Sequence, residues 1–381
     1  TSILLQPIRT PMSRKLVTIR KVSAILPIPN CDNIALAIID GWSVIVKKTE
    51  FNVNDICLFF EIDSFIPVSD TRFEFLKKTT EFDGQTGYRL KTMKMKGVIS
   101  QGLALPFSMF PELSPGLEDY SDQLNVIKYD NAAQEQMQRP GLKTGKPRGS
   151  FPSFIPKTDQ ERIQNLTHLW HTLPTDSQFE ETLKLDGSSM TCYKTAYTPT
   201  LWDKIKSFFG YKLMNYHFGV CSRNLELAPD ANNTITFDNQ GKSSEYSQSN
   251  FWTAAKKYSI ESKLPIGYAV QGELIGPKIQ ANHEKVSTLE YYVFDVFDIS
   301  TGLYLTPTKR REFCALHNIP HVPVTNTSFE PFQYSLQDLL EHVDGESMNP
   351  GTISEGRVYK HLTSPLSFKC ISNRYLLKSE V

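Results

Sequence analysis

The sequence predicts an α+β protein with two domains, a small β-barrel followed by a mixed α/β domain. The chain has 381 residues, a length that suits two domains better than one. Short β-rich segments separated by turn signals fill its first part, whereas helix and strand patterns are mixed in the remainder. Residues 136–158 carry four prolines and three glycines, as linkers do. We place the boundary near residue 150, between a domain of residues 1–150 that includes the linker and a domain of residues 151–381.

About five strands and little helix are expected in the first domain. They are residues 16–25, 34–46, 56–66, 88–96 and 99–105. Residues 34–46 should form a hairpin, because Asp40-Gly41 supplies the positive φ that a tight turn needs. A small barrel of short strands is typical of the OB-fold, so we expect that fold here.

The predicted strand 88–96 (YRLKTMKMK) alternates cations with apolar residues. Such a face on an OB barrel can follow the phosphates of a nucleic acid, although a solvated outer face without function fits the pattern equally well. The linker 136–158 is also basic and contains no acid, which suits contact with a polyanion. The candidate nucleic-acid contacts are Arg89, Lys91, Lys94, Lys96 and Arg148.

The composition of the chain excludes some classes of protein. Lys plus Arg and Asp plus Glu both total 41, so the chain is not a general polycation. No apolar segment approaches the length of a bilayer span, so we expect no membrane partner. Six cysteines without a Cys-x-x-Cys pair indicate free thiols and a reducing intracellular compartment, the cytoplasm or nucleus, with an organelle as the alternative. Nothing indicates more than a monomer.

The second domain combines helix and strand signals. Residues 158–161 (TDQE) have the spacing of a capping box and predict a helix that continues to about residue 169. Further helices are expected from about residue 250 to 260 and over residues 336–342. Strands are expected over residues 268–275 and 291–299, and an amphipathic insertion over residues 204–211.

The clearest chemical signal is Lys184-Leu185-Asp186-Gly187, which has the Lys-x-Asp-Gly pattern of covalent nucleotidyl transferases. Their lysine amine attacks a nucleoside phosphate and must be neutral when it does so. Burial, neighbouring cations and a bound metal can each lower its pKa. The glycine lets the backbone pass close to the nucleotide. Four residues recur by chance, however, and an ordinary solvated lysine is the alternative unless matching partners follow.

Matching fragments do follow in order along the chain. They are VCSRNLE with Arg223, VQGELIG with Glu273, YYVFD with Phe294 and Asp295, SEGRVYK with Glu355 and Lys360, and LSFKCI with Lys369. Each fragment alone has a structural explanation as part of a strand or turn. Together, in this order, they are hard to obtain by accident.

The second domain thus resembles the nucleotidyltransferase domain of the ligase and capping-enzyme superfamily. Within it, the chain is most similar to ATP-dependent RNA ligases with an N-terminal OB domain, the kind known from Naegleria and Deinococcus. Three strings favour this branch: KLDGSS (184–189), VCSRN (220–224) and FPSFIPKT (151–158). The basic strand that ends in SQGL (100–103) also fits the OB domain of that branch. The resemblance covers most of the chain and is weakest over residues 1–15 and 196–216.

The resemblance implies a role for each matched residue. Lys184 would attack the α-phosphorus of ATP, while Lys360 and Lys369 would neutralise the α-phosphate and orient the departing pyrophosphate. Glu355 would hold Mg²⁺ or Mn²⁺, directly or through water, since Mg²⁺ needs only one or two carboxylates. The other implied nucleotide contacts are Thr182, Leu183, Arg223 on phosphate or the acceptor end, Glu273 on the ribose and Phe294 on the adenine.

One position departs from the pattern of the family. Many relatives carry a second lysine two residues after the lysine of the last motif, and here that position is Ile371. Either Lys369 suffices in this chain, or another cation such as Arg374 contributes.

The implied function is the joining of RNA 3′-hydroxyl and 5′-phosphate ends through a lysyl-AMP intermediate and an AMP-capped 5′ end. The expected partner is RNA or a nicked duplex with RNA on the 3′-hydroxyl strand. DNA ligases are disfavoured because they usually have arginine where Ser189 stands. DNA ligases and capping guanylyltransferases also place an OB domain after the last motif, and here only 12 residues follow Lys369. A nucleic-acid-binding protein with an inactive transferase scaffold is the remaining alternative.

Overall fold

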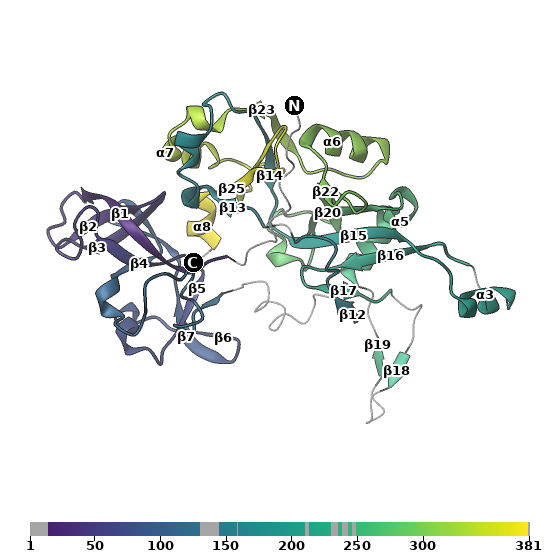
Figure 1. Ribbon diagram of the computed structural model, residues 1–381, viewed down its shortest axis with the longest axis horizontal. Helices are drawn as coiled ribbons and strands as arrows, with labels where there is room; N and C mark the ends of the chain where they lie inside the picture. The colour runs from purple at the N-terminus through teal and green to yellow at the C-terminus, as the bar shows by residue number, and fades with distance from the viewer. Residues whose placement is uncertain are drawn as a thin grey trace.

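The computed structural model describes residues 14–129, 145–157, 159–209, 213–229, 235–237, 243–245 and 249–379. These residues form a β-rich N-terminal part, purple to blue in Figure 1, and a larger part of mixed strands and helices, teal to yellow. The predicted α+β architecture is confirmed.

The N-terminal part consists of two antiparallel sheets and a hairpin. The first sheet has the order β10-β4-β1-β2-β3, with β1 (Val17–Pro27), β2 (Ile34–Ile39), β3 (Trp42–Lys47), β4 (Ile56–Phe60) and β10 (Leu103–Pro106). The second has the order β11-β5-β7-β6, with β5 (Ser64–Pro67), β6 (Thr80–Phe82), β7 (Gln85–Arg89) and β11 (Ile127–Lys128). The hairpin is β8 (Thr92–Met95) with β9 (Val98–Gln101), and the 3-10 helices are η1 (Thr71–Leu76) and η2 (Phe107–Met109). Phe60, Phe73 and Phe110 are among the buried aromatic residues of its core.

The predicted hairpin over residues 34–46 is confirmed as β2 and β3, and Asp40 at its turn has a φ of 52°. The single strand predicted over residues 56–66 is wrong. It divides into β4 and β5, which belong to different sheets, and Asp63 between them has a φ of 67°. A continuous apolar pattern does not reveal a change of sheet, because both strands are buried.

Two further predicted strands are also divided. Residues 88–96 split between β7 and β8, and residues 99–105 split between β9 and β10. Gly102 at the second break has a φ of 92°, and a Cβ there would lie 2.6 Å from the carbonyl oxygen of Phe60. Only glycine combines this backbone conformation with so close an approach of β4.

The second part contains two larger sheets. The seven-stranded sheet has the order β12-β17-β16-β15-β20-β21-β22, with β12 (Pro147–Ser150), β15 (Ser188–Ala196), β16 (Tyr216–Cys221), β17 (Leu225–Leu227), β20 (Tyr268–Ile275), β21 (Glu290–Asp298) and β22 (Leu303–Tyr304). The five-stranded sheet has the order β13-β25-β24-β14-β23, with β13 (Glu161–Arg162), β14 (Phe179–Lys184), β23 (Val324–Phe329), β24 (Gly356–His361) and β25 (Ser367–Ile371). The short strands β18 (Ile235–Phe237) and β19 (Ser243–Glu245) pair with each other.

The helices of this part are short. They are α2 (Leu169–Thr172), α3 (Leu201–Phe208), α4 (Asn250–Lys257), α5 (Ile260–Lys263), α6 (Pro307–Leu316), α7 (Leu336–His342) and α8 (Asn373–Ser379), with 3-10 turns η3 (Ile163–Asn165), η4 (Gln280–Asn282) and η5 (Pro331–Gln333). The predicted helices near 250–260 and over 336–342 and the predicted strands over 268–275 and 291–299 are confirmed. Among the described residues, no helix is long and apolar enough to cross a membrane.

The amphipathic insertion expected over residues 204–211 contains α3, which begins three residues earlier, at Leu201. Its apolar side chains face solvent, since Leu201, Trp202 and Phe208 are 75%, 71% and 89% exposed. Figure 1 shows α3 at the end of the β15–β16 hairpin, away from the rest of the second part. Residues 210–212 lie outside the described residues.

The helix predicted after residues 158–161 is wrong. Residues 161–162 form β13 and residues 163–165 form η3, so α-helix begins only at α2. Strand β13 pairs in parallel with β25, with Arg162 opposite Lys369. The capping-box spacing is a local rule and takes no account of a partner strand so far along the chain. Thr158 lies outside the described residues.

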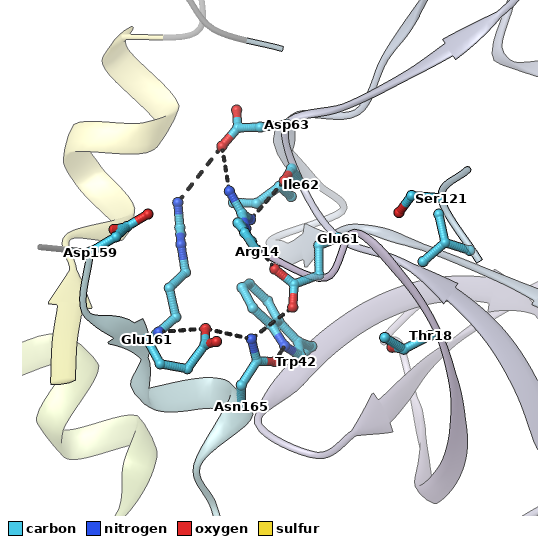
Figure 2. Close-up of polar contacts among 12 residues, drawn as sticks. Arg14, Thr18, Trp42, Glu61, Ile62, Asp63, Ser121, Asp159, Glu161 and Asn165 are labelled. Carbon is cyan, nitrogen blue, oxygen red and sulfur yellow. Dashed lines mark hydrogen bonds and ion pairs between the residues drawn. The ribbon is translucent and has the colours of Figure 1, made fainter. Parts of the chain in front are cut away.

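The two parts are packed against each other (Figure 2). Leu376 of α8 belongs to the same apolar cluster as Trp42 of the N-terminal part. Asn165 Nδ2 donates to Glu61 Oε1 at 2.7 Å, and Asn165 Oδ1 accepts from Trp42 Nε1 at 2.7 Å. The boundary near residue 150 stays a prediction, and β12, which ends at Ser150, already pairs with β17 of the second part.

Candidate active site

Lys184 ends strand β14, which lies between β23 and β24. Its backbone pairs with Gly356 on β24, and this register brings its side chain next to Glu355. Lys184 Nζ donates to Glu355 Oε1 at 2.7 Å. The chain then crosses to β15 in the other sheet through Gly187, where a Cβ would lie 2.3 Å from the carbonyl oxygen of Leu274. Close contact with β20 therefore requires glycine at this crossing.

Three carboxylates, those of Glu355, Glu273 and Asp186, act on Lys184. Burial lowers the pKa of Lys184, but the charges of Glu355 and Glu273 and the hydrogen bond to Glu355 outweigh it, so the pKa is raised above its ordinary value. Burial, with a contribution from the charge of Glu355, raises the pKa of Glu273 to about 8 and that of Asp186 to about 6. The expectation of a lowered lysine pKa is therefore not met here, because the nearest charges are carboxylates and not cations.

The carboxylates beside Lys184 suit a divalent cation. Burial and the charge of Glu355 disfavour the charged forms of Glu273 and Asp186, and a cation would offset both effects. In the described part of the chain, no group of three or more His, Cys, Asp or Glu side chains is arranged to ligate a metal alone. Mg²⁺ needs fewer protein ligands, since it keeps several waters and binds one or two carboxylates together with substrate phosphates. Glu355, the partner of Lys184, can therefore be the protein carboxylate of such a Mg²⁺ site.

Lys360 on β24 is held by residues of β21 in the other sheet. Its Nζ donates to the carbonyl oxygen of Phe294 at 2.6 Å and to Asp295 Oδ1 at 2.5 Å. Asp295 lies 3.8 Å from Arg310, whose guanidinium also pairs with the buried Glu180. Burial lowers the pKa of Lys360 to about 8, although the charge of Asp295 opposes this shift. A buried ion network thus fixes the position of Lys360.

Phe294 is half-buried and packs in one apolar cluster with Leu183. The Lys360 ammonium lies 5.7 Å from the centroid of its ring. Thr182 is buried, and its hydroxyl donates to the carbonyl oxygen of Val358 at 3.4 Å. The structure therefore brings Phe294 and Leu183 together near Lys360, whereas the Thr182 hydroxyl is already bonded within the sheet.

Lys369 on β25 and Arg223 in the β16–β17 turn meet at one carboxylate. Lys369 Nζ donates to Asp159 Oδ1 at 2.6 Å, and Arg223 Nη2 lies 3.7 Å from Asp159 Oδ2. Burial lowers the pKa of Lys369 to about 8, the charge of Asp159 opposes the shift, and the charge of Lys184 adds to it. Lys369 and Arg223, two of the predicted phosphate contacts, thus lie near Lys184 although they come from separate parts of the chain.

Comparison with known proteins shows to which family this arrangement of site residues belongs. A sequence profile for RNA ligases matches residues 177–378, and one for an OB-fold domain matches residues 16–107. The chain belongs to the RNA ligase family. The expected OB-fold and the resemblance to RNA ligases with an N-terminal OB domain are confirmed. A search of curated proteins finds no match to the chain.

Solved structures of the RNA ligase of Naegleria gruberi are similar to this ligase over 96–97% of its length. A glutamate mutant with ATP and Mn is 35% identical, with 97% of this chain and 100% of that chain covered and a TM-score of 0.81. The form with PPi is also 35% identical, with 97% and 99% covered and a TM-score of 0.81. A lysine mutant with AMP and Mn is 35% identical, with 96% and 99% covered and a TM-score of 0.80.

The predicted nucleic-acid contacts of the ligase differ in exposure. Arg89 has a side chain that is 9% exposed, lies 3.2 Å from Asp63 and stacks on the ring of Tyr129 at 4.2 Å. This position does not favour phosphate contact, because the cation is already paired inside the protein. The other candidates are Lys94 and Lys96, which are exposed, Lys91, which is half-buried, and Arg148, which is 48% exposed and lies 3.6 Å from Glu226.

Four residues near the site of the ligase were not among its predicted site residues: Asp159, Arg162, Asp186 and Asp295. Asp186 and Asp295 stand inside the predicted fragments, so a signal for them was present in the sequence. Arg162 and Asp159 approach Lys369 only because β13 pairs with β25. No local pattern in the sequence indicates that pairing.

Proposed function

We propose that the ligase joins RNA 3′-hydroxyl and 5′-phosphate ends, using ATP, through an AMP held covalently on Lys184. The observation that carries this proposal is the pairing of Lys184 with Glu355, with Lys360 on the neighbouring strand β24 and Lys369 on β25 beyond it. The structures of the Naegleria gruberi ligase with ATP and Mn, with AMP and Mn, and with PPi support it, since these are the small molecules of such a reaction.

In the first step, the neutral amine of Lys184 attacks the α-phosphorus of ATP. A nitrogen–phosphorus bond forms, the bond between the α-phosphorus and the bridging oxygen breaks, and pyrophosphate leaves with the electron pair. Lys184 must first lose the proton that it donates to Glu355 Oε1. Lys360 and Lys369 place positive charge where the phosphates gain negative charge. Glu355 would hold Mg²⁺ or Mn²⁺, which when bound neutralises phosphate oxygens.

Phe294 and Leu183 would form the adenine side of the nucleotide site. The ring of Phe294 is half-buried in one apolar cluster with Leu183, and its exposed part would stack on the base. Glu273 would accept from the ribose hydroxyls, and such donors favour its charged form against burial. Arg223 would contact phosphate or the acceptor end, and Thr182 would support the strand that carries Lys184.

In the second step an oxygen of a 5′-phosphate attacks the phosphorus of the lysyl-AMP, and the nitrogen–phosphorus bond breaks to free Lys184. In the third step a 3′-hydroxyl attacks the phosphorus of that 5′-phosphate, and AMP leaves with the oxygen that bridged the two phosphorus atoms. We propose a nick with RNA on the 3′-hydroxyl strand as the substrate, on the strength of the resemblance to the OB-domain branch. The exposed Lys94 and Lys96 on the β8–β9 hairpin, with Lys91 and Arg148, would contact the duplex backbone, which makes binding sensitive to salt.

The test is the intact mass of the protein after incubation with ATP and Mg²⁺, with GTP in parallel. Pyrophosphate treatment comes first, so that any AMP already attached is removed. A gain of one AMP from ATP alone, mapped to Lys184, supports the proposal. A gain of GMP from GTP would indicate capping chemistry. The absence of any adduct would indicate an inactive scaffold. Nicked duplexes with RNA or DNA on the 3′-hydroxyl strand then test the substrate, and equal sealing of both would contradict the preference for RNA.

We further propose that the ligase acts as a monomer in a reducing intracellular compartment. All six cysteines are free thiols, and five of them are buried, which supports a reducing environment. Light scattering after size-exclusion chromatography tests the monomer, and a mass of twice the chain would contradict it.

A further inference from the structure

Asp159 joins two cations that belong to different elements of the site. Its Oδ1 accepts from Lys369 on β25 at 2.6 Å, and its Oδ2 lies 3.7 Å from Arg223 in the β16–β17 turn. Lys128, at the end of β11 in the OB domain, adds a third positive charge. Figure 2 shows Asp159 beside the yellow C-terminal segment, on the chain that connects the two domains.

Charge, not packing, keeps this carboxylate in place. Burial alone would raise the pKa of Asp159, but the charges of Lys369, Lys128 and Arg223 and the hydrogen bond from Lys369 lower it below its ordinary value. The side chain nevertheless remains 40% exposed. Asp159 is therefore ionised and has access to solvent, so it can leave the two cations without burying a charge.

We propose that Asp159 occupies a phosphate position between Lys369 and Arg223, and that an incoming phosphate group must displace it. Carboxylates and phosphates are both anions that accept hydrogen bonds from lysine and arginine, so both cannot pair with these two cations at once. This inference rests on the proposed function, which assigns phosphate binding to Lys369 and Arg223. The phosphate comes either from the nucleotide or from the 5′ end of RNA.

Replacing Asp159 by asparagine removes the competing charge and keeps the size of the side chain. Phosphate binding should then tighten roughly two- to fivefold, the range expected when one partially exposed ion pair is lost. Asp159→Glu keeps the charge and should bind phosphate like the wild type. If Asp159 served only to position Lys369, the asparagine variant would bind phosphate more weakly, since Lys369 would lose the partner that holds it.

The experiment measures binding to the full chain by calorimetry, without divalent metal so that no adduct forms. The probes are pyrophosphate, ATP and adenosine, and RNA oligonucleotides with a 5′-phosphate or a 5′-hydroxyl. Tighter binding of pyrophosphate and ATP, but not adenosine, by Asp159→Asn assigns the position to the nucleotide phosphates. Tighter binding of 5′-phosphate RNA alone assigns it to the RNA end. The matched control is Glu118→Gln, which removes the carboxylate of an exposed ion pair with Lys15 in the OB domain.

Unchanged or weaker binding of every phosphate probe by Asp159→Asn overturns the proposal, as does an equal gain with Glu118→Gln. Lys369→Ala tests the proposed function separately. If that variant binds pyrophosphate, ATP and 5′-phosphate RNA like the wild type, the assignment of Lys369 fails and the role of Asp159 fails with it. If it binds them more weakly while Asp159→Asn changes nothing, only the role of Asp159 fails.

Discussion

Lys360 Nζ and Asp295 Oδ1 lie 2.5 Å apart and join the two sheets of the nucleotidyltransferase domain. Lys360 belongs to β24 of the five-stranded sheet and Asp295 to β21 of the seven-stranded sheet. Behind them, Arg310 pairs with Glu180 in the protein interior. The position of one cation of the site therefore depends on how the two sheets are docked and on the charge of Asp295.

Asp295→Asn should move the alkaline limb of the pH–rate profile for lysine adenylylation to lower pH. Burial lowers the pKa of Lys360 to about 8 and the charge of Asp295 opposes it, so loss of that charge lets Lys360 lose its proton at lower pH. The neutral amine then no longer offsets charge on the phosphates. Adenylylation rates measured at a pH near that pKa and at a pH well below it test this prediction. A loss of rate that is equal at all pH values would contradict it.

Phe294→Ala should weaken ATP use by about 1–3 kcal/mol, or roughly 5- to 150-fold in KM, the value of one base–aromatic stack. Phe294→Leu is the matched control, because it retains apolar volume against Leu183 but lacks the ring face. Both variants should lose affinity for ATP, while only the alanine variant should also unfold at a clearly lower temperature. ATP use at the wild-type level in both would rule out the stack.

The parts of the site that could be predicted lie in fragments with local patterns. Lys184, Glu355 and Phe294 stand in short strings whose order along the chain is visible. β20 is a strongly apolar run, and α7 has apolar residues at helical spacing. These features need no knowledge of distant partners. The family resemblance depends on them, which is why fold and chemistry could both be inferred.

The parts that could not be predicted depend on contacts between distant segments. The break at Asp63 places its carboxylate among Arg14, Arg89 and Arg162, and nothing near residue 63 in the sequence indicates these partners. The charge state of Lys184 was missed for the same reason, since its nearest partner, Glu355, is brought to it by strand pairing.

Lys184→Met should abolish the AMP adduct and also change how stability depends on pH. The folded pKa of Glu273 is raised by burial from its ordinary 4.5 to about 8, and the charge of Lys184 opposes this shift. The folded protein thus holds more protons than the unfolded chain between these values, so stability falls as pH rises through them. Removing the lysine charge should raise the folded pKa of Glu273 further and so extend that fall to higher pH.

Lys184→Arg is the matched control, since it keeps the charge but supplies no amine of similar reactivity. It should form no adduct and retain the pH dependence of the wild type in urea unfolding. An adduct on either variant would refute the assignment of Lys184. A methionine variant whose stability follows the wild type at every pH would instead show that the carboxylates do not depend on this lysine.

Asn165→Ala should loosen the contact between the domains and impair sealing more than adenylylation. Asn165 Oδ1 accepts from Trp42 Nε1 at 2.7 Å, and its Nδ2 donates to Glu61 Oε1 at 2.7 Å (Figure 2). Trp42 is fully buried, so an unpaired Nε1–H there costs about 1–3 kcal/mol. Lys184 and its partners all lie in the second domain, so AMP transfer to Lys184 should be spared. The proposed duplex contacts lie in the first domain, so a loosened contact between the domains should displace them from the site. Rates of adduct formation and of nick sealing at one salt concentration check this, and a parallel loss of both would mean that the contact serves stability alone.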